Sequence, residues 1–296
     1  MMRCLLIITC LLLSPYTAAN DSFPSIHHDL QVTLAPNDGQ LRVIDRIQLT
    51  APVKKLSLLL HGDLKLQKLL DNIEIDDRAV SAWLPLKRYT LQFPIPTQQF
   101  TLTYEGTITH DLRPTSQEYS GGRSSTPGLI SDDGVFLSSS SFWYPQIDDS
   151  LVSFNLQVTL PKQWRSVSQG EEISTNRWRE TQPQDDIYLI AAPFQVYNRD
   201  TAIAKTQVFI RAKDDALATR YLDATEHYLQ LYSELLGDYP YAKFALVENF
   251  WESGYGMPSF TLLGPRVIRF YRPPATSNRR RVDARTSSSK CKTESC

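Results

Sequence analysis

Short runs of alternating apolar and polar residues, separated by turns, restrict the fold of this chain more than any other feature. They lie between Asp21 and about Thr201 and are rich in Val, Ile, Thr and aromatic residues, as in QLRVIDRIQLT, QFTLTYEGTIT and SLVSFNLQVTLP. Period-two alternation places successive side chains on opposite faces of a strand, and the Pro, Asp and Gly residues between the runs favour turns. The pattern predicts an all-β domain of eight or more strands, a sandwich or a saddle.

A helical periodicity follows. Between Asp214 and Leu236, apolar residues recur at i, i+3, i+4 and i+7, which is the spacing of a helix with one buried face. Asp214 or Asp215 is suited to cap its start and Gly237 its end. The sequence therefore predicts a helix over 214–236.

Two apolar segments after this helix, KFALVENFW and SFTLLGPRVIRF, predict strands around 244–251 and 259–269 that flank a GYGMP turn. We expect a β domain over 20–201, followed over 202–270 by the start of an α/β domain whose apolar surface is partly exposed. The stretch 111–133 has no periodicity and is dense in Ser, Gly, Pro and Asp, so it predicts a long surface loop, either functional or simply variable.

The first nineteen residues have the pattern of a secretory signal peptide. Arg3 precedes an apolar run from Cys4 to Leu13, and Ser14-Pro15 and a small-residue stretch follow it. The run has about ten residues, whereas a spanning helix needs about twenty. We expect an exported protein, periplasmic or secreted, that is not stably embedded in a membrane once the signal is removed. An uncleaved anchor and a lipoprotein modified at Cys10 remain the alternatives.

Residues 271–296 hold seven basic residues, two acidic residues and one larger aliphatic residue, Val282. Such a segment cannot bury an apolar face. Three interpretations remain open: a natural disordered tail, an arm that binds an anionic surface or nucleic acid, and a stretch read out of its native frame. The abrupt loss of the strand pattern at Arg269-Phe270 favours the third.

Composition excludes several classes of site. The net charge of −1 gives no sign of a nucleic-acid partner. Residues 20–290 contain no cysteine, so they hold neither a disulfide framework nor a cysteine-ligated zinc site. Neither a G-x-S-x-G nucleophile motif nor a P-loop occurs. No two of the five histidines have the H-E-x-x-H spacing of a zinc peptidase helix, and we predict no catalytic residue and no metal ligand in this chain. His27 and His28 are interpreted as ordinary strand-edge residues, and a site at His227 with Asp223 is not favoured.

One stretch does suggest a binding function. Gly254 and Gly256 permit close approach of another backbone, Tyr255 and Met257 offer apolar contact, and Pro258 fixes the chain direction. We predict that these five residues bind an extended peptide along a strand edge. A plain β-hairpin turn is the alternative.

Several motifs, in order, resemble the aminopeptidase N family of zinc metallopeptidases, peptidase family M1. They are HHDLQVTLAP with LRVIDRIQL, LTYEGTI, FLSSSSFWYPQID, FNLQVTLPKQW, LLGDYPYAKFALVEN and GYGMPSFTLLG, and they extend over about 22–270. The resemblance implies a saddle-shaped β domain followed by a thermolysin-like catalytic domain, whose edge strand holds peptide or protein substrate.

The chain departs from that family in two places. The family's edge strand carries G-x-M-E-N, whose glutamate binds the substrate's α-amine; this chain keeps the glycine and Met257 but has Pro258 at the position of the glutamate. The family's H-E-x-x-H helix and third ligand should follow, yet the basic tail occupies that place. Zinc is thus implied for an intact relative, and no cofactor is predicted here. We expect either a metallopeptidase-like protein that is inactive as encoded, or a non-catalytic peptide- or partner-binding β-domain protein of the cell envelope.

Overall fold

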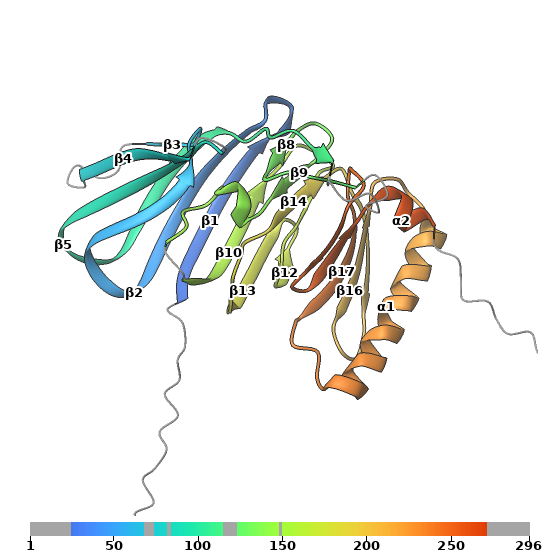
Figure 1. The fold of residues 1–296 in the computed structure, drawn as a ribbon. Helices are drawn as coiled ribbons and strands as arrows, with labels where there is room; N and C mark the ends of the chain where they lie inside the picture. Colours follow the sequence, from blue (N-terminus) through green and yellow to red (C-terminus); the bar gives the residue numbers. More distant parts are fainter. Residues whose placement is uncertain (1–24, 68–73, 82–83, 115–122, 148–149, 271–296) are drawn as a thin grey trace, which may run out of the picture.

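A large curved sheet forms the N-terminal part of the molecule (Figure 1). The computed structural model describes residues 25–67, 74–81, 84–114, 123–147 and 150–270, so the predicted signal peptide and the basic tail lie outside the described residues. The strands run in the order β12-β13-β10-β1-β2-β5-β3, and β4 also pairs with β5. Their bounds are β1 (Ser25–Ala35), β2 (Gln40–His61), β3 (Lys65–Leu66), β4 (Glu74–Ser81), β5 (Leu86–Thr107), β10 (Leu151–Thr159), β12 (Glu171–Ser174) and β13 (Arg177–Gln184).

A smaller four-stranded sheet, in the order β11-β14-β9-β8, contributes to the core beneath the large sheet. Its strands are β8 (Leu129–Ile130), β9 (Val135–Leu137), β11 (Arg165–Val167) and β14 (Leu189–Ala192), and a separate ribbon pairs β6 (Arg113–Pro114) with β7 (Ser124–Ser125). Single-turn 3-10 helices, η1 and η2, lie at Pro36–Asp38 and Ser139–Ser141. The predicted loop over 111–133 is therefore wrong in part, because Ile130 is buried and β6, β7 and β8 lie within that range. The mainly β architecture is confirmed.

A five-stranded sheet forms the C-terminal part, in the order β15-β16-β17-β19-β18. Its strands are β15 (Gln195–Asp200), β16 (Lys205–Ile210), β17 (Lys243–Glu248), β18 (Gly254–Met257) and β19 (Phe260–Leu263). The strand predicted over 259–269 is wrong beyond Leu263, since Pro265–Arg269 form a short helix, α2. Proline fits the first helical turn because its missing N–H has no helical partner there.

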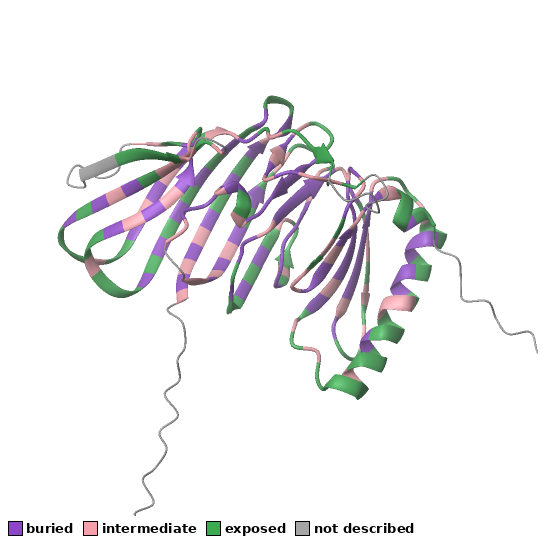
Figure 2. Ribbon diagram, in the orientation of Figure 1, coloured by how far each residue is buried: buried purple, intermediate pink, exposed green. Residues whose placement is uncertain are grey.

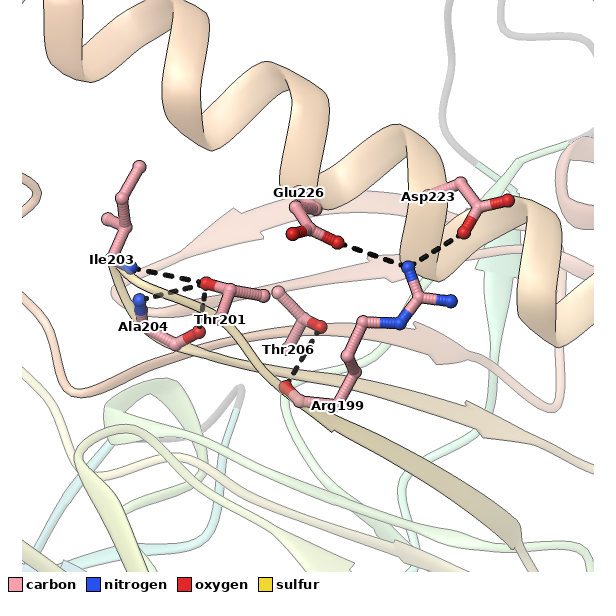
Figure 3. Close-up of polar contacts among 7 residues, drawn as sticks. All are labelled: Arg199, Thr201, Ile203, Ala204, Thr206, Asp223 and Glu226. Carbon is pink, nitrogen blue, oxygen red and sulfur yellow. Dashed lines mark hydrogen bonds and ion pairs between the residues drawn. The ribbon is translucent and has the colours of Figure 1, made fainter.

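The helix predicted over 214–236 is confirmed as α1 (Asp215–Leu236). Asp214 caps it, and its Oδ1 accepts the Leu217 backbone N–H at 2.9 Å; Gly237 ends it with φ +100°. Arg199 of β15 ties the helix to the sheet through Nη1, 2.7 Å from Asp223 and 3.1 Å from Glu226 (Figure 3). Asp223 is thus held by a guanidinium.

The two faces of the five-stranded sheet pack against different partners. Val208, Ile210 and Leu246 form a cluster with Leu222 of α1 and Ile268 of α2. On the other face, Phe209, Val247 and Phe260 join the core of the large and four-stranded sheets. The predicted boundary at residue 202 falls in the turn between β15 and β16, which are paired strands of one sheet. The C-terminal part thus shares its core with the β domain.

Burial follows the same alternation along the chain (Figure 2). The first half of β2 alternates strictly between exposed and buried residues, as its sequence predicts. The outer surface of α1 is an exception, because Tyr228, Tyr232, Leu235 and Leu236 are all exposed. The apolar stripe of α1 is therefore wider than the face it buries.

Candidate peptide-binding edge

The five predicted binding residues lie along β18 and the turn that follows it. β18 is the last strand of its sheet and pairs antiparallel with β19, in the register Gly254 with Leu263 and Gly256 with Thr261. One step before this ladder, the Gly264 N–H donates to the Ser253 carbonyl at 2.9 Å. Hydrogen-bonded and non-hydrogen-bonded pairs alternate in an antiparallel ladder. The N–H and C=O groups of Gly254 and Gly256 are therefore directed away from β19, toward the sheet edge.

Both glycines of β18 are exposed, and they leave space beside this edge. A Cβ on Gly256 would meet no atom within 4 Å, and one on Gly254 would approach only the Arg123 guanidinium, at 3.9 Å. Their outward backbone groups are accessible without hindrance from side chains of their own. The edge is thus suited to accept another extended backbone.

Tyr255 and Met257 anchor the strand from the opposite side. Both are partly buried against the main core, and the Tyr255 ring lies 5.5 Å from that of Phe136. Burial raises the pKa of Tyr255. These side chains pack β18 against the main core, which includes Phe136 of the four-stranded sheet.

Pro258 and Ser259 form the two-residue turn between β18 and β19. Ser259 has φ +66°, which is the backbone conformation of the third residue of a type II turn, and proline is favoured just before it. Lys243 holds this turn from beneath: its Nζ donates to Ser259 Oγ at 2.9 Å and to the Ser259 carbonyl at 3.3 Å. The turn predicted over GYGMP is therefore wrong for its first four residues, because GYGM is the strand β18 and the turn lies at 258–259.

Lys243 is fully buried, with its amine 5.2 Å from the Trp178 ring centre and 5.4 Å from that of Phe260. Burial lowers its pKa to about 7, although Glu172 and Glu180 oppose the shift. Sequence reasoning missed this residue, because a lysine in an apolar strand segment is ordinarily assigned to the surface. Only the pairing of β17 with β19 brings it to the turn.

The start of β18 is fastened to the β6–β7 ribbon. The Ser124 N–H donates to the Glu252 carbonyl at 3.1 Å, and Trp251 Nε1–H donates to the Ser124 carbonyl at 2.9 Å. Residues separated by more than 120 positions in the sequence therefore meet at this end of the edge. No local sequence pattern predicts this contact.

The histidine and acidic side chains in the part of the chain that the structure describes can be compared with the requirements of a zinc site. No three His, Cys, Asp or Glu side chains gather into a metal-binding group among the described residues. His28 lies on β1, an interior strand, and is buried, with Nδ1 2.8 Å from Asp45 Oδ2; its interpretation as a strand-edge residue was wrong. The sequence did not reveal this, because Asp45 becomes its neighbour only through the pairing of β1 with β2.

His61 and His110 come closest to a metal pair, with their Nε2 atoms 2.8 Å apart. However, His61 Nδ1 accepts the Asp63 backbone N–H at 3.2 Å, so in the neutral ring the proton is on Nε2. That proton is donated to His110. Metal-bound histidines show the opposite arrangement, with Nδ1 protonated when Nε2 is the ligand. The pair is therefore a hydrogen bond, and these residues do not fit zinc.

No protein-family model and no curated protein matches the sequence, but the fold matches solved structures. A variant of the M1 zinc metallopeptidase from Deinococcus radiodurans has a TM-score of 0.58 at 13% identity, covering 82% of this chain and 61% of that one. The structure of this variant bound to a Tyr-Ser-Ala substrate has a TM-score of 0.57 at 15% identity, covering 88% of this chain and 62% of that one. An aminopeptidase N family protein from Idiomarina loihiensis has a TM-score of 0.52 at 12% identity, covering 81% of this chain and 42% of that one. This chain shares its fold with M1 zinc metallopeptidases.

The similarity to these structures is limited in both coverage and sequence identity. The chain spans about three fifths of the length of the Deinococcus neighbours, and at such low identity it is the fold that is shared. None of the described helices is long and apolar enough to cross a membrane.

Proposed function

We propose that this protein is an exported, metallopeptidase-like protein that binds an extended peptide along β18 and, as encoded, does not hydrolyse it. The observation that carries the proposal is the outward direction of the Gly254 and Gly256 backbones on the last strand of the sheet. An extended peptide that adds to such an edge gains main-chain hydrogen bonds, and its side chains supply specificity. A fold neighbour whose structure contains a Tyr-Ser-Ala substrate supports a peptide ligand.

Absence of hydrolysis is proposed from the chemistry of the residues present. Zinc peptidases need three protein ligands and an activated water. The five histidines of this chain are spread over three regions, and the one close pair has its shared proton between the two Nε2 atoms. Export is proposed from the signal-peptide pattern of residues 1–19.

Calorimetry with a set of N-methylated peptides tests the binding mode. Peptides of one sequence are methylated at one backbone nitrogen at a time and titrated into the purified protein. Pairing along one edge uses every second peptide N–H, so alternate methylations should weaken binding about tenfold or more and the intervening ones should have little effect. Equal effects at all positions, or no heat with any peptide, would overturn the proposal.

Hydrolysis is tested on the same samples. Chromatography of each peptide after incubation with protein and added zinc should recover it uncleaved. Stoichiometric zinc in the purified protein, together with cleavage that a chelator stops, would contradict the non-hydrolysing assignment while leaving the edge as the substrate site.

A second candidate is a scaffolding protein of the cell envelope, whose ligand is an edge strand of a partner protein and not a short peptide. The exposed apolar stripe on α1, which offers additional contact area, favours it. Micromolar binding of short peptides would favour the first candidate. Binding that requires a folded partner would favour the second.

A further inference from the structure

The β18 edge carries a positive charge at one end. Arg123 directly precedes β7 and is exposed, and the next residue, Ser124, is hydrogen-bonded to both Glu252 and Trp251. Its guanidinium Cζ and Nη2 lie 3.9 Å and 4.0 Å from the position of a Cβ on Gly254. The hydrogen bonds of Ser124 thus position the Arg123 guanidinium close to Gly254, the first residue of β18.

The direction of a bound peptide decides what Arg123 meets. Antiparallel pairing is the more stable and the more frequent arrangement. A peptide that runs antiparallel to β18 has its amino end near Pro258 and its carboxyl end near Gly254. Strand residues are spaced about 3.4 Å apart. A peptide residue opposite Gly256 is therefore followed by one opposite Tyr255 and by a second opposite Gly254, near the guanidinium.

At the opposite end of the edge, no hydrogen bond or ion pair among the described residues brings a carboxylate to the turn, where an α-amine could meet it. There, the Pro258–Ser259 turn contacts the buried amine of Lys243. At the Gly254 end, the carboxylate of Glu252 is paired with Arg266 at 3.1 Å, so Arg123 adds a net positive charge there. This charge pattern favours a ligand that is recognised by its carboxyl terminus.

We propose that Arg123 binds the C-terminal carboxylate of a peptide lying antiparallel along β18, so that the preferred ligands are short peptides with a free carboxyl end. The inference rests on the proposed peptide-binding function of the same edge. A guanidinium presents two parallel N–H groups that match a carboxylate. Arg123 makes a further contact of its own, and its five N–H donors allow more than one acceptor.

Calorimetry compares two peptides of identical sequence, one with a free carboxyl end and one with a C-terminal amide. We expect the purified protein to bind the acid at least tenfold more tightly than the amide, with a preference that decreases as salt is raised. Arg123→Gln should abolish the preference by weakening acid binding alone, and Arg123→Lys should retain part of it, because an ammonium lacks the fork of the guanidinium.

Arg266→Gln is the matched control. It removes an exposed arginine that is paired with Glu252 at the same end of the strand, so it changes the net charge equally. We expect this variant to keep the preference for the acid. A similar loss in both variants would indicate a general charge effect and overturn the role of Arg123.

The remaining outcomes separate the two proposals. Equal affinity of the unaltered protein for acid and amide would overturn the carboxylate inference and leave peptide binding intact. Binding of neither peptide would overturn the proposed function itself. The comparison of acid with amide needs no variant, so it remains decisive even if Arg123→Gln fails to fold.

Discussion

The buried amine of Lys243 donates a 2.9 Å hydrogen bond to the Ser259 hydroxyl, across the sheet from the residue's own strand to the turn that ends β18. Ser259 has a positive φ, which costs a non-glycine residue free energy. The contact offsets this cost and positions Met257 and Pro258 at the end of the candidate binding edge. The edge therefore depends on an ionisable group that lies entirely inside the protein.

Lys243→Met should flatten the dependence of stability on pH at alkaline pH. Burial lowers the native pKa of Lys243 to about 7 from its ordinary 10.5, so between these values the native protein binds fewer protons than the unfolded chain. The free energy of unfolding therefore rises with pH over this window, by about 2–5 kcal/mol for this group. Urea denaturation at pH 7, 8, 9 and 10 measures the difference in slope between the protein and the variant.

Ser259→Ala controls for the loss of the hydrogen bond. It removes one acceptor but keeps the buried amine, so the alkaline rise in stability should persist in this variant. If Lys243→Met shows the same slope as the unaltered protein, the amine of Lys243 does not titrate over this range and does not cause the rise in stability.

The His61–His110 pair should make the protein less stable in mild acid. Burial, followed by the neighbouring His110, lowers the pKa of His61 to about 4 from 6.5. Between these values the unfolded chain takes up a proton that the native state refuses, so stability is fully present above pH 6.5 and decreases toward pH 4. We expect this group to contribute on the order of 1–3 kcal/mol, measured by denaturation at pH 7, 6, 5 and 4.

His61→Asn should reduce that acid sensitivity, whatever its effect on stability at pH 7. His227→Gln, at an exposed ring on α1, is the matched control and should leave the pH dependence unchanged. An unchanged acid transition in His61→Asn would show that other groups control it.

Local patterns predicted much of this structure because the elements concerned depend on local physics. The alternation in β2 and the cap at Asp214 appear directly in the sequence. The apolar run GPRVIRF suggested a strand where the structure has the helix α2, because at five residues periodicity does not separate the two.

The polar interior of the structure was not predictable in the same way. Lys243 and Ser259 meet because β17 and β19 are paired, while Arg123 reaches Gly254 through a contact between segments about 130 residues apart. A single sequence contains no signal of such pairings. The sequence thus suggested the residues of the candidate edge, whereas the groups that contact it, such as Lys243 and Arg123, were found only in three dimensions.

The ion-pair network of Arg199 should contribute little to stability, although it joins β15 to α1 (Figure 3). The side chains of Arg199, Asp223 and Glu226 are 32%, 61% and 47% exposed. Solvent and the loss of side-chain entropy weaken such exposed ion pairs. A double-mutant cycle of Arg199→Ala with Asp223→Ala should give a coupling of about 0.2–1 kcal/mol that falls in 0.5 M salt. A coupling above about 2 kcal/mol would show that the network determines how α1 docks.

The exposed end of α1 should drive self-association. Leu235 and Leu236 are 68% and 84% exposed, beside a groove of about 670 Å³ that Tyr228, Tyr232 and Tyr239 help to line. Exposed apolar patches of this kind promote association. The double variant Leu235→Gln/Leu236→Gln should therefore stay monomeric at higher concentration in analytical ultracentrifugation, with an unchanged thermal midpoint.

Leu229→Gln, at a buried position of the same helix, should instead lower the midpoint, because it removes core contacts. If the double variant associates as strongly as the unaltered protein, another surface is responsible.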